Sequence, residues 1–575
     1  MATDNITYNP EEWLTHFEKS GGVSSPSYDE TIKYFEKFAR KTKQAQIKSL
    51  GYSAKGRDIK YLVISNDSDF TPKRARRDGK VVVLIQNGIH SGEIEGKDAT
   101  MLLLREILIT KEKKDLLDNL VLLIIPVLNV DGHERISPYN RPNQNGPVEM
   151  GWRTTAENLN LNRDYLKAAS PEMRALLRMF STWMPDFYID NHTTNGMDYQ
   201  YHISYAMEDH DNIDKGLGDW GRDKLMPVVI NKVEADGFLT GPYLELKGGE
   251  IEQGITSYPM LPRFSTGYAA AQNRLCLLVE THSLKPFENR VRSTKSMNEA
   301  VLGYLNKNSE EIKQLNKKAD LKAVSQYSLK KQDFPLVLQG AEDSVPFKFK
   351  GVKSYTKFSP VTGSHVRFYT DEPEEIVIPQ FAKSVVANAI KIPFAYIIPK
   401  EFNEAVRVLK LHGVKVKQLS ADTKLAVEKI TFTTADFAPR PYEGRQRVEY
   451  SVSKTEEEIL FEKGTYVVLS AQRAIKVIAY LLEPESEDSF MSWGYFNIFL
   501  ERKEYAEAYV FEPIAQKMLD ENPELAKEFN KRLEDGNFAS SPGERLDFFY
   551  RRSPYFDERE NVYPVFRAVK KFKNF

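Results

Sequence analysis

Two side chains near residue 90 have the types and the spacing of metal ligands. His90 and Glu93 lie three residues apart, a spacing at which both can reach one ion where the chain turns into a helix. A catalytic zinc ion usually takes three protein ligands and keeps its fourth position for water. His192, further along the chain, is a third ligand of the right type. The sequence therefore predicts one zinc ion per chain, held by His90, Glu93 and His192.

The positions of these residues after apolar runs are stronger evidence for a metal site than their spacing is. Nine histidines and 81 acidic residues in a chain of 575 would produce such a His–acid pair by chance. His90, however, comes shortly after an apolar run at 81–86, and His192 follows a second one at 186–190. In α/β sheets, ligands gather at the carboxyl ends of strands. We therefore expect the two histidines at the same edge of one sheet, although an isolated histidine there is often only structural.

Glu280 is an acidic residue that a buried strand would carry to the same edge. It follows five apolar residues at 275–279, and a buried carboxylate without a partner is very costly. Its side chain must therefore face a partner or a cavity. A salt bridge at the end of the strand is the alternative to a catalytic role.

The elements that position these residues alternate between strands and helices over the first 300 residues. Continuous apolar strands between helices indicate an α/β sheet with helices on both faces. The predicted strands cover 59–65, 81–86, 121–128, 186–190 and 275–281, and the predicted helices cover 28–42, 93–109 and 171–182. Two long polar stretches at 132–157 and 240–268 break this order. Because long irregular loops in a compact domain are usually functional, we expect both to border the site.

The pattern of predicted strands and helices changes near residue 318. Residues 1–317 are predicted to form the catalytic domain, a mixed sheet with helices on both faces. Residues 318–575 are predicted to form an accessory region of mixed α/β or β-rich structure, as one or two small domains. Within it the sequence predicts strands at 344–356 and 366–378, a strand–helix–strand unit at 392–418, strands within 464–483 and a helical tail from 503.

Composition excludes several other classes of protein. The formal net charge is -1, so no overall field favours nucleic acid or an anionic membrane. The longest apolar run, 121–130, contains Pro126 and is too short to span a bilayer. Cys276 is the one cysteine, so no intrachain disulfide or cysteine-type zinc site forms. No export signal is visible at the start of the sequence; export with the signal removed is favoured over a cytoplasmic location. The oligomeric state stays open.

The order of several short motifs resembles that of the zinc carboxypeptidases of the carboxypeptidase A type. The resemblance covers about 28–310, and the ordered set is more specific than any single member. The matching segments are Gly51-Tyr52-Ser53-Ala54-Lys55-Gly56-Arg57, His90-Ser91-Gly92-Glu93, Asn129-Val130-Asp131-Gly132, Trp152-Arg153, Asn160-Leu161-Asn162-Arg163, Asp190-Asn191-His192 and Val279-Glu280-Thr281.

This resemblance implies a role for each matched residue. His90, Glu93 and His192 would bind zinc, and Glu280 would be the general base that takes a proton from water. Arg153 would stabilise the oxyanion. The pair Asn162 and Arg163 would bind the terminal carboxylate of the substrate, because a guanidinium matches a carboxylate in a bidentate way.

The family also has a mobile tyrosine upstream of the glutamate, for which Tyr258 and Tyr268 are both candidates. The pocket for the substrate's last side chain would come from about 255–268. Arg263 in that stretch would either receive an acidic group or be structural.

Two positions depart from the family pattern. Asn160 stands where the family usually has an aspartate that supports a zinc-bound histidine. Outer carboxylates of this kind fix the imidazole tautomer and raise its basicity, so metal affinity is expected to be lower here. Gly92 stands where digestive members carry an arginine, which weakens any inference about the far end of the peptide site.

The implied activity is hydrolysis of a C-terminal peptide bond, or of a peptide-like amide, in a peptide or peptide-like substrate. One alternative is a zinc deacylase of the aspartoacylase type that acts on N-acyl amino acids. A second is a binding protein that has kept the peptidase fold but lost catalysis, although such proteins usually lack a ligand or the glutamate. A third, sugar binding by the C-terminal half, is not supported by any pattern of aromatic residues.

Overall fold

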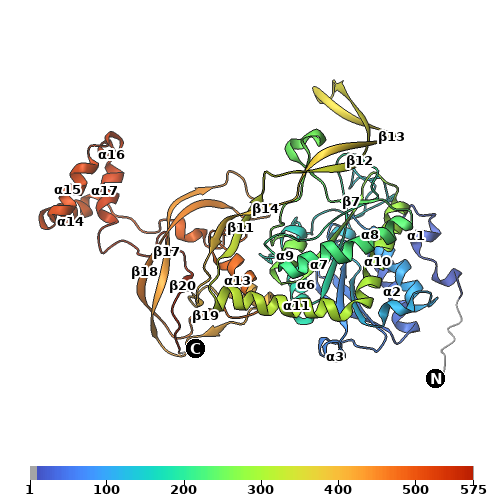
Figure 1. The fold of residues 1–575 in the computed structure, drawn as a ribbon. Coiled ribbons are helices and arrows are strands. Elements are labelled where there is room, and N and C mark those ends of the chain that lie inside the picture. The colour runs from blue at the N-terminus through green and yellow to red at the C-terminus, as the bar shows by residue number, and fades with distance from the viewer. Residues whose placement is uncertain (1–8, 574) are drawn as a thin grey trace.

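An eight-stranded mixed sheet forms the centre of the N-terminal half (Figure 1). The computed structural model describes residues 9–573 and 575. The strand order is β1-β2-β4-β3-β5-β10-β6-β7. The strands are β1 (Ala45–Tyr52), β2 (Asp58–Ser65), β3 (Val81–Gln86), β4 (Leu120–Ile125), β5 (Phe187–Thr194), β6 (Ile203–Ala206), β7 (Thr240–Pro242) and β10 (Leu275–His282). The four central strands β4, β3, β5 and β10 run parallel, and β6 runs antiparallel to β10.

Helices cover both faces of this sheet, as the apolar strands predict. Along β3, side chains alternate between two faces. Val82 and Leu84 belong to one hydrophobic cluster, which includes side chains of α6 (Pro171–Trp183). Val83 and Ile85 belong to another, which includes side chains of α4 (Glu95–Leu108) and α10 (Phe287–Lys307). The α/β fold expected from the sequence is therefore confirmed.

The element bounds in the N-terminal half differ little from the predicted ones. Helix α2 (Tyr28–Lys41) begins at a capping box formed by Ser27 and Glu30, which ends the preceding loop. Strand β10 carries Cys276, which is 2% exposed and lies in the core. Strand β4 ends three residues before its predicted end and β5 ends four residues after it, and α4 begins at Glu95 and not at residue 93. Both candidate ligands at 90 and 93 therefore lie in the turn between β3 and α4.

The C-terminal half contains three further sheets. A long hairpin of β12 (Val345–Ser359) and β13 (Ser364–Phe381) joins a short sheet with β8 (Glu245–Leu246) and β9 (Ile255–Thr256). Strands β11 (Phe334–Gly340) and β14 (Ser384–Ile390) form a pair. A six-stranded sheet has the order β16-β19-β15-β20-β17-β18. Its strands are β15 (Ala395–Ile398), β16 (Lys417–Gln418), β17 (Thr423–Phe437), β18 (Val448–Phe461), β19 (Tyr466–Leu469) and β20 (Phe566–Ala568).

One predicted segment of this half is partly wrong. Residues 464–483 were expected to form strands, but only β19 does so, and α13 (Ile475–Leu482) follows it. Every residue of α13 is buried. A short run that is apolar on all sides does not show whether its period is that of a strand or of a helix. The strand–helix–strand unit is present as β15, α12 (Asn403–Leu411) and β16.

The helical tail forms a separate unit at the far end of the molecule from the N-terminal sheet (Figure 1). It comprises α14 (Ala508–Glu521), α15 (Pro523–Arg532), α16 (Gly536–Ser540) and α17 (Pro542–Tyr550), which pack around their own hydrophobic cluster. The chain then returns to the six-stranded sheet as β20.

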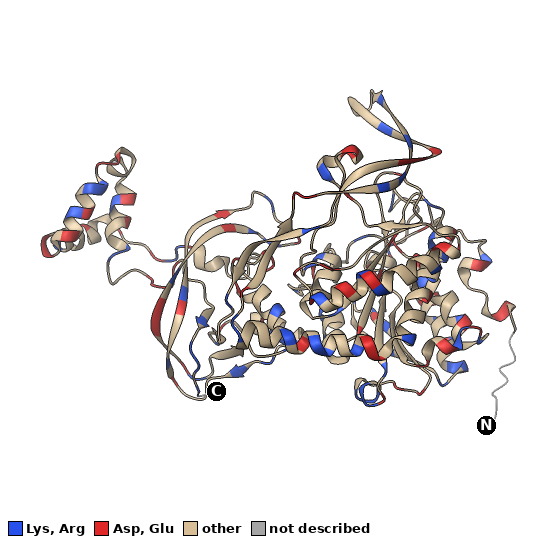
Figure 2. Cartoon of the chain, in the orientation of Figure 1, with Lys and Arg blue, Asp and Glu red and all other residues tan. Residues whose placement is uncertain are grey.

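The two predicted domains share a core. Helix α11 (Ser309–Ala323) runs across residue 317, and one hydrophobic cluster includes both Leu176 of α6 and Val406 of α12. The division at residue 317 stays a prediction. Figure 2 shows acidic and basic residues interspersed over both halves, in keeping with the net charge of -1. No helix among residues 9–573 is long and apolar enough to cross a membrane.

Candidate metal centre

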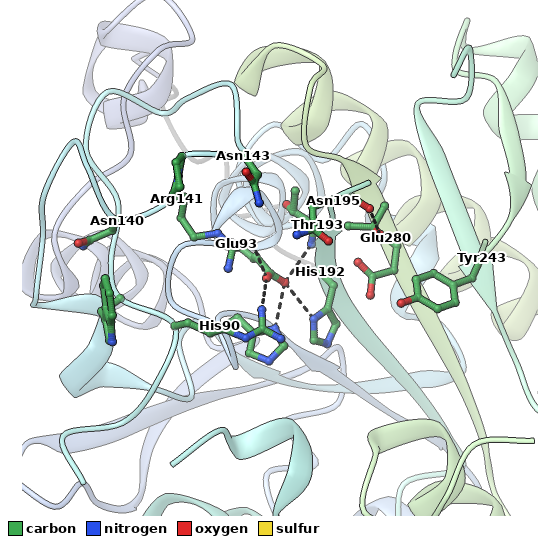
Figure 3. A pocket seen from close by; sticks show the side chains of 14 residues that line it. His90, Glu93, Asn140, Arg141, Asn143, His192, Thr193, Asn195, Tyr243 and Glu280 are labelled. Atoms are coloured by element: carbon green, nitrogen blue, oxygen red, sulfur yellow. Dashed lines mark hydrogen bonds and ion pairs between the residues drawn. The ribbon is translucent and has the colours of Figure 1, made fainter. Parts of the chain in front are cut away.

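The three predicted metal ligands converge at the carboxyl ends of β3 and β5 (Figure 3). The Glu93 Oε2 atom lies 3.1 Å from Nδ1 of His90 and 3.1 Å from Nδ1 of His192. One ligand atom from each residue lies within 4.8 Å of the others, and all three side chains are buried. The turn that brings the first two together is closed by the Glu93 N–H, which donates to the His90 carbonyl at 2.9 Å.

The far nitrogen of each imidazole is held by an oxygen acceptor. His90 Nε2 lies 3.0 Å from Asn160 Oδ1, which also accepts the Asn162 N–H at 3.0 Å. His192 Nε2 lies 2.8 Å from Asp190 Oδ2. Because these oxygens accept, each Nε2 carries the hydrogen when the ring is neutral. Each neutral ring then turns an Nδ1 lone pair toward the Glu93 carboxylate.

This donor set fits a divalent cation. Two lone pairs and a carboxylate oxygen directed at one point repel each other unless a positive charge lies between them. Two histidines and one glutamate, with their outer nitrogens held, are the ligands and the support that a catalytic zinc site uses. Burial lowers the pKa of His90 to about 4, which keeps this ring neutral and able to bind a cation. Although burial opposes it, Asp190 raises the pKa of His192 well above its usual value.

Asp190 is a supporting residue that the sequence reasoning missed. It lies two residues before His192 on β5, so both side chains point to the same face of the strand. Its second oxygen accepts from Gln86 Nε2 at 2.9 Å. The sequence indicated a loss of charge at Asn160, whereas the structure shows a carboxylate on the other histidine. The spacing of Asp190 and His192 on one strand was the available signal.

Glu280 borders the same cavity from β10. The parallel register of β5 and β10 pairs Glu280 directly with His192. Burial raises the pKa of the Glu280 carboxyl group to about 8. A nearby cation would lower this pKa again, because it favours the charged carboxylate. In Figure 3, Glu280 and Tyr243 lie side by side at one side of the cavity.

Two arginines reach the Glu93 carboxylate from the long loop at 132–157. Arg153 Nη1 lies 3.1 Å from Glu93 Oε1, and its side chain is 41% exposed. Arg141 Nη2 lies 2.8 Å from the same oxygen. The sequence reasoning named Arg153 and missed Arg141. A Cβ added to Gly92 would lie 2.6 Å from Arg141 Cγ, so the glycine between the two ligands leaves the space that Arg141 occupies.

The triad, both arginines, Tyr243 and Glu280 line one cavity of about 420 Å³. Asn162 and Arg163 lie beside this cavity and not in its lining. The Asn162 Oδ1 atom accepts the Ser265 N–H at 3.3 Å. The Arg163 guanidinium lies 4.4 Å from the centre of the Phe264 ring. Their role in binding a carboxylate stays a prediction.

Neither predicted tyrosine lines the cavity of the triad. The Tyr268 ring is buried between Tyr165 and Phe180, and its hydroxyl accepts from Gln272 Nε2 at 2.8 Å, so it is a core residue. Tyr258 lines a neighbouring cavity. Tyr243 is the tyrosine that the structure places beside Glu280. It belongs to the irregular stretch 240–268 that was expected to border the site, but no spacing distinguished it there.

Arg263, the other candidate of that stretch, is structural. Its Nε donates to Asp488 Oδ1 at 2.7 Å, and both side chains are buried. Its guanidinium also lies 5.0 Å from the centre of the Trp493 ring. Arg263 is therefore engaged with the C-terminal half and is not available to a substrate.

Several known proteins are similar to this chain. Residues 31–215 match the family model described as zinc carboxypeptidase. Carboxypeptidase 2 of Trichophyton rubrum is 26% identical over 497 residues, which cover 83% of this chain and 85% of that protein. Carboxypeptidase 2 of Trichophyton equinum is 24% identical over 499 residues, with the same two shares. The crystal structure of a metallo-carboxypeptidase from Burkholderia cenocepacia covers 49% of this chain and 70% of its own, at 17% identity and a TM-score of 0.36.

Proposed function

This chain is a member of the zinc carboxypeptidase family of metallopeptidases, and we propose that it releases the last residue of a peptide chain. One zinc ion would be held by His90, Glu93 and His192. The observation that carries the proposal is the convergence of two imidazole Nδ1 atoms and one carboxylate on a cavity that Glu280 also lines.

Each residue of the site has a distinct task in this reaction. When bound, zinc lowers the pKa of a water molecule and polarises a carbonyl group. Glu280 takes a proton from the attacking water and passes it to the leaving amine. Arg153 donates hydrogen bonds to the oxygen of the scissile carbonyl as negative charge develops there. Its partly exposed side chain leaves this guanidinium free to turn from Glu93 toward a substrate.

Asn162 and Arg163 would select the end of the chain. A free carboxylate bound by Arg163 places the last peptide bond over the metal centre and excludes interior bonds. The guanidinium already has one face against Phe264, which fixes its plane and lowers the entropy lost on binding. The family implies a peptide substrate, and a location outside the cytoplasm stays a prediction from the sequence.

The deacylase alternative shares the zinc ligands and differs in its substrate. N-acyl amino acids carry the same free carboxylate but lack a peptide chain on the other side of the scissile bond. Blocked dipeptides and N-acyl amino acids, compared at equal concentration, separate the two activities. Preferred hydrolysis of the N-acyl amino acids would contradict the peptidase proposal. Hydrolysis of neither, in protein that holds zinc, would favour the binding-protein alternative.

The first experiment separates metal binding from proton transfer. Glu280→Gln is expected to lower the hydrolysis rate by at least ~10², the usual scale for loss of a general base, while zinc content stays near one ion per chain. His90→Ala and His192→Ala are expected to lose the zinc. Zinc content and peptide hydrolysis are measured on the same samples.

Glu288→Gln is the matched control, because this partly exposed glutamate of α10 lies outside the cavity lining and forms an ion pair with Arg292. It is expected to leave both measurements unchanged. Near-normal turnover in Glu280→Gln would assign the base to another residue, and full zinc retention in either histidine variant would overturn the ligand set.

A further inference from the structure

Arg141 is a second arginine on the Glu93 carboxylate, and the proposed reaction gives it no task. We propose that Arg141 is a positioning residue: it stays on Glu93 and so releases Arg153 to the carbonyl oxygen of the substrate. The inference rests on the proposed carboxypeptidase activity and deepens it. In Figure 3, the Arg141 side chain extends toward Glu93 from one side of the cavity.

The two carboxylate oxygens of Glu93 have different partners. Oε2 lies 3.1 Å from Nδ1 of each histidine of the triad and accepts the Thr193 N–H at 3.1 Å. Oε1 lies 2.8 Å from Arg141 Nη2 and 3.1 Å from Arg153 Nη1. Oε2 is therefore the oxygen directed at the metal position, and Oε1 is the oxygen that the arginines hold.

The two arginines differ in how freely they can leave this oxygen. The Arg141 side chain is 13% exposed, whereas that of Arg153 is 41% exposed, so Arg153 is the one that can turn toward a substrate. If Arg153 were the sole partner of Oε1, its departure would leave a buried carboxylate oxygen without a donor, which is costly. Because Arg141 stays, this cost is avoided, and Arg153 is available when negative charge develops on the substrate.

The surrounding loop fixes Arg141 in this position. Its carbonyl accepts the Gln144 N–H at 3.0 Å, and Gln144 Nε2 donates to the carbonyl of Gly92 at 2.8 Å. The next residue, Asn145, donates its N–H to the Ser283 carbonyl at 2.8 Å. The Arg141 side chain packs over Gly92, where an added Cβ would lie 2.6 Å from Arg141 Cγ. The glycine between the two ligands thus leaves room for the guanidinium to reach the carboxylate.

A double-mutant cycle tests whether Arg141 acts through Arg153. On one blocked peptide with a free C-terminus, Arg141→Gln is expected to lower kcat about 10-fold, the scale of one charge-assisted hydrogen bond. KM should change little, because the contact that is lost forms as the reaction proceeds and not on binding. In an Arg153→Gln background the same replacement should have no further effect, since no arginine is left to release. Arg141→Lys, which keeps a cation beside Glu93, should recover most of the rate.

Zinc binding provides a readout that does not depend on turnover. Competition with a chelator should give a midpoint for Arg141→Gln close to that of the wild type, because Arg153 then holds Oε1 alone. The double variant leaves Oε1 without either arginine, so its midpoint should shift by more than the two single shifts added together. Circular dichroism on the same samples detects any loss of fold.

Arg292→Gln is the control variant, because this exposed arginine pairs with another glutamate, Glu288, outside the cavity lining. It should change neither kcat nor zinc binding. Full activity of Arg141→Gln, an equally large loss of rate in the Arg153→Gln background, or a strictly additive zinc shift would overturn the positioning role. Absence of hydrolysis by the zinc-loaded wild type on every free-acid peptide would instead overturn the proposed function.

Discussion

A carboxylate holds one of the two histidines of the candidate metal centre. It belongs to Asp190 and holds His192, whereas residue 160, which holds His90, is an asparagine. The amide of Asn160 holds His90 Nε2 at 3.0 Å, and the carboxylate of Asp190 holds His192 Nε2 at 2.8 Å. A carboxylate raises the basicity of an imidazole more than an amide does. A carboxylate is thus present beside the other histidine, and the lower metal affinity expected from Asn160 stays a prediction.

We expect Asp190→Asn to weaken zinc binding by about 10- to 100-fold, the usual effect of losing such a partner. The isosteric amide can still hold the ring, but it removes the charge. Competition with a chelator of known affinity measures this directly and does not depend on turnover. Asn160→Asp, which adds a carboxylate on the other side, is the matched comparison and should bind zinc at least as well as wild type.

An unchanged chelator midpoint in Asp190→Asn would contradict this role. A shift accompanied by a loss of secondary structure would point to a structural role instead, so circular dichroism is recorded on the same samples. Asparagine has one acceptor oxygen where Asp190 has two, so the variant holds His192 only if Gln86, whose Nε2 donates to the other Asp190 oxygen, turns its amide.

The site residues identified from the sequence lie at or near the carboxyl ends of apolar strands, and the residues that were missed lie in irregular loops. His90 follows β3, and His192 and Glu280 lie near the carboxyl ends of β5 and β10, where burial restricts the directions in which side chains can point. Arg141 and Tyr243 lie in long irregular stretches, where only tertiary contacts decide which side chain turns inward. Tyr268, one of the two candidate tyrosines, could not be recognised as a core residue from the sequence for the same reason, because its burial comes from packing against Phe180 and His412.

At the scale of elements, the strands were predicted closely and the segments after them were not. The run at 81–86 is β3 to the residue, since a strand buried on both faces is apolar throughout. The same reasoning failed at α13, a fully buried helix that is apolar apart from Lys476. The two ligands at 90 and 93 meet through a turn before α4 and not through helical spacing. The three-residue spacing of the two ligands was predicted correctly, but these residues form a turn and not the first turn of a helix.

The loop that ends at Arg163 is expected to give the enzyme its preference for a free C-terminus. An amidated peptide offers no charge to the guanidinium, so kcat/KM on the free acid should exceed that on the amide by at least ~10-fold, since a charge-assisted hydrogen bond contributes about 1.5–3 kcal/mol. Arg163→Ala should remove most of this preference, chiefly by raising KM. Arg174→Ala, at a partly exposed arginine near the start of α6, serves as control.

Equal rates on acid and amide, or release of internal fragments, would indicate an endopeptidase. The zinc ligands would then stand, and the assignment of Asn162 and Arg163 would be withdrawn.

At the scale of the whole molecule, the C-terminal half contacts Asn160, the residue that holds His90. A turn between β17 and β18 places Glu443 where its Oε2 accepts the Asn160 N–H at 2.9 Å. Tyr442 beside it stacks on Trp493 at 5.9 Å between ring centres, and the buried pair of Arg263 and Asp488 fastens the same region. Residues beyond 317 thus help to position Asn160, whose side chain holds His90.

We expect Glu443→Gly to lower kcat/KM by about fivefold, because one hydrogen bond of this kind contributes about 1 kcal/mol. Glu443 has a φ of 50°, a left-handed conformation that glycine adopts without strain. The glycine variant therefore removes the side chain without disturbing the turn, and its melting temperature should not fall. Peptide kinetics and thermal unfolding measured together separate the two effects.

Glu443→Gln keeps the acceptor and should behave as wild type. If Glu443→Gly also kept full activity, the contact to Asn160 would be incidental to catalysis, and the C-terminal half would contribute to stability alone.

The single cysteine of the chain can be used to measure local opening of the strand beside this site. Cys276 lies in β10, four residues before Glu280, and it is 2% exposed. Burial raises the pKa of its thiol well above the usual value, so the folded form reacts slowly with thiol reagents. Alkylation of the native protein therefore proceeds only through openings that expose β10. Its rate reports how often the strand that carries Glu280 separates from its neighbours, and no residue has to be replaced to measure it.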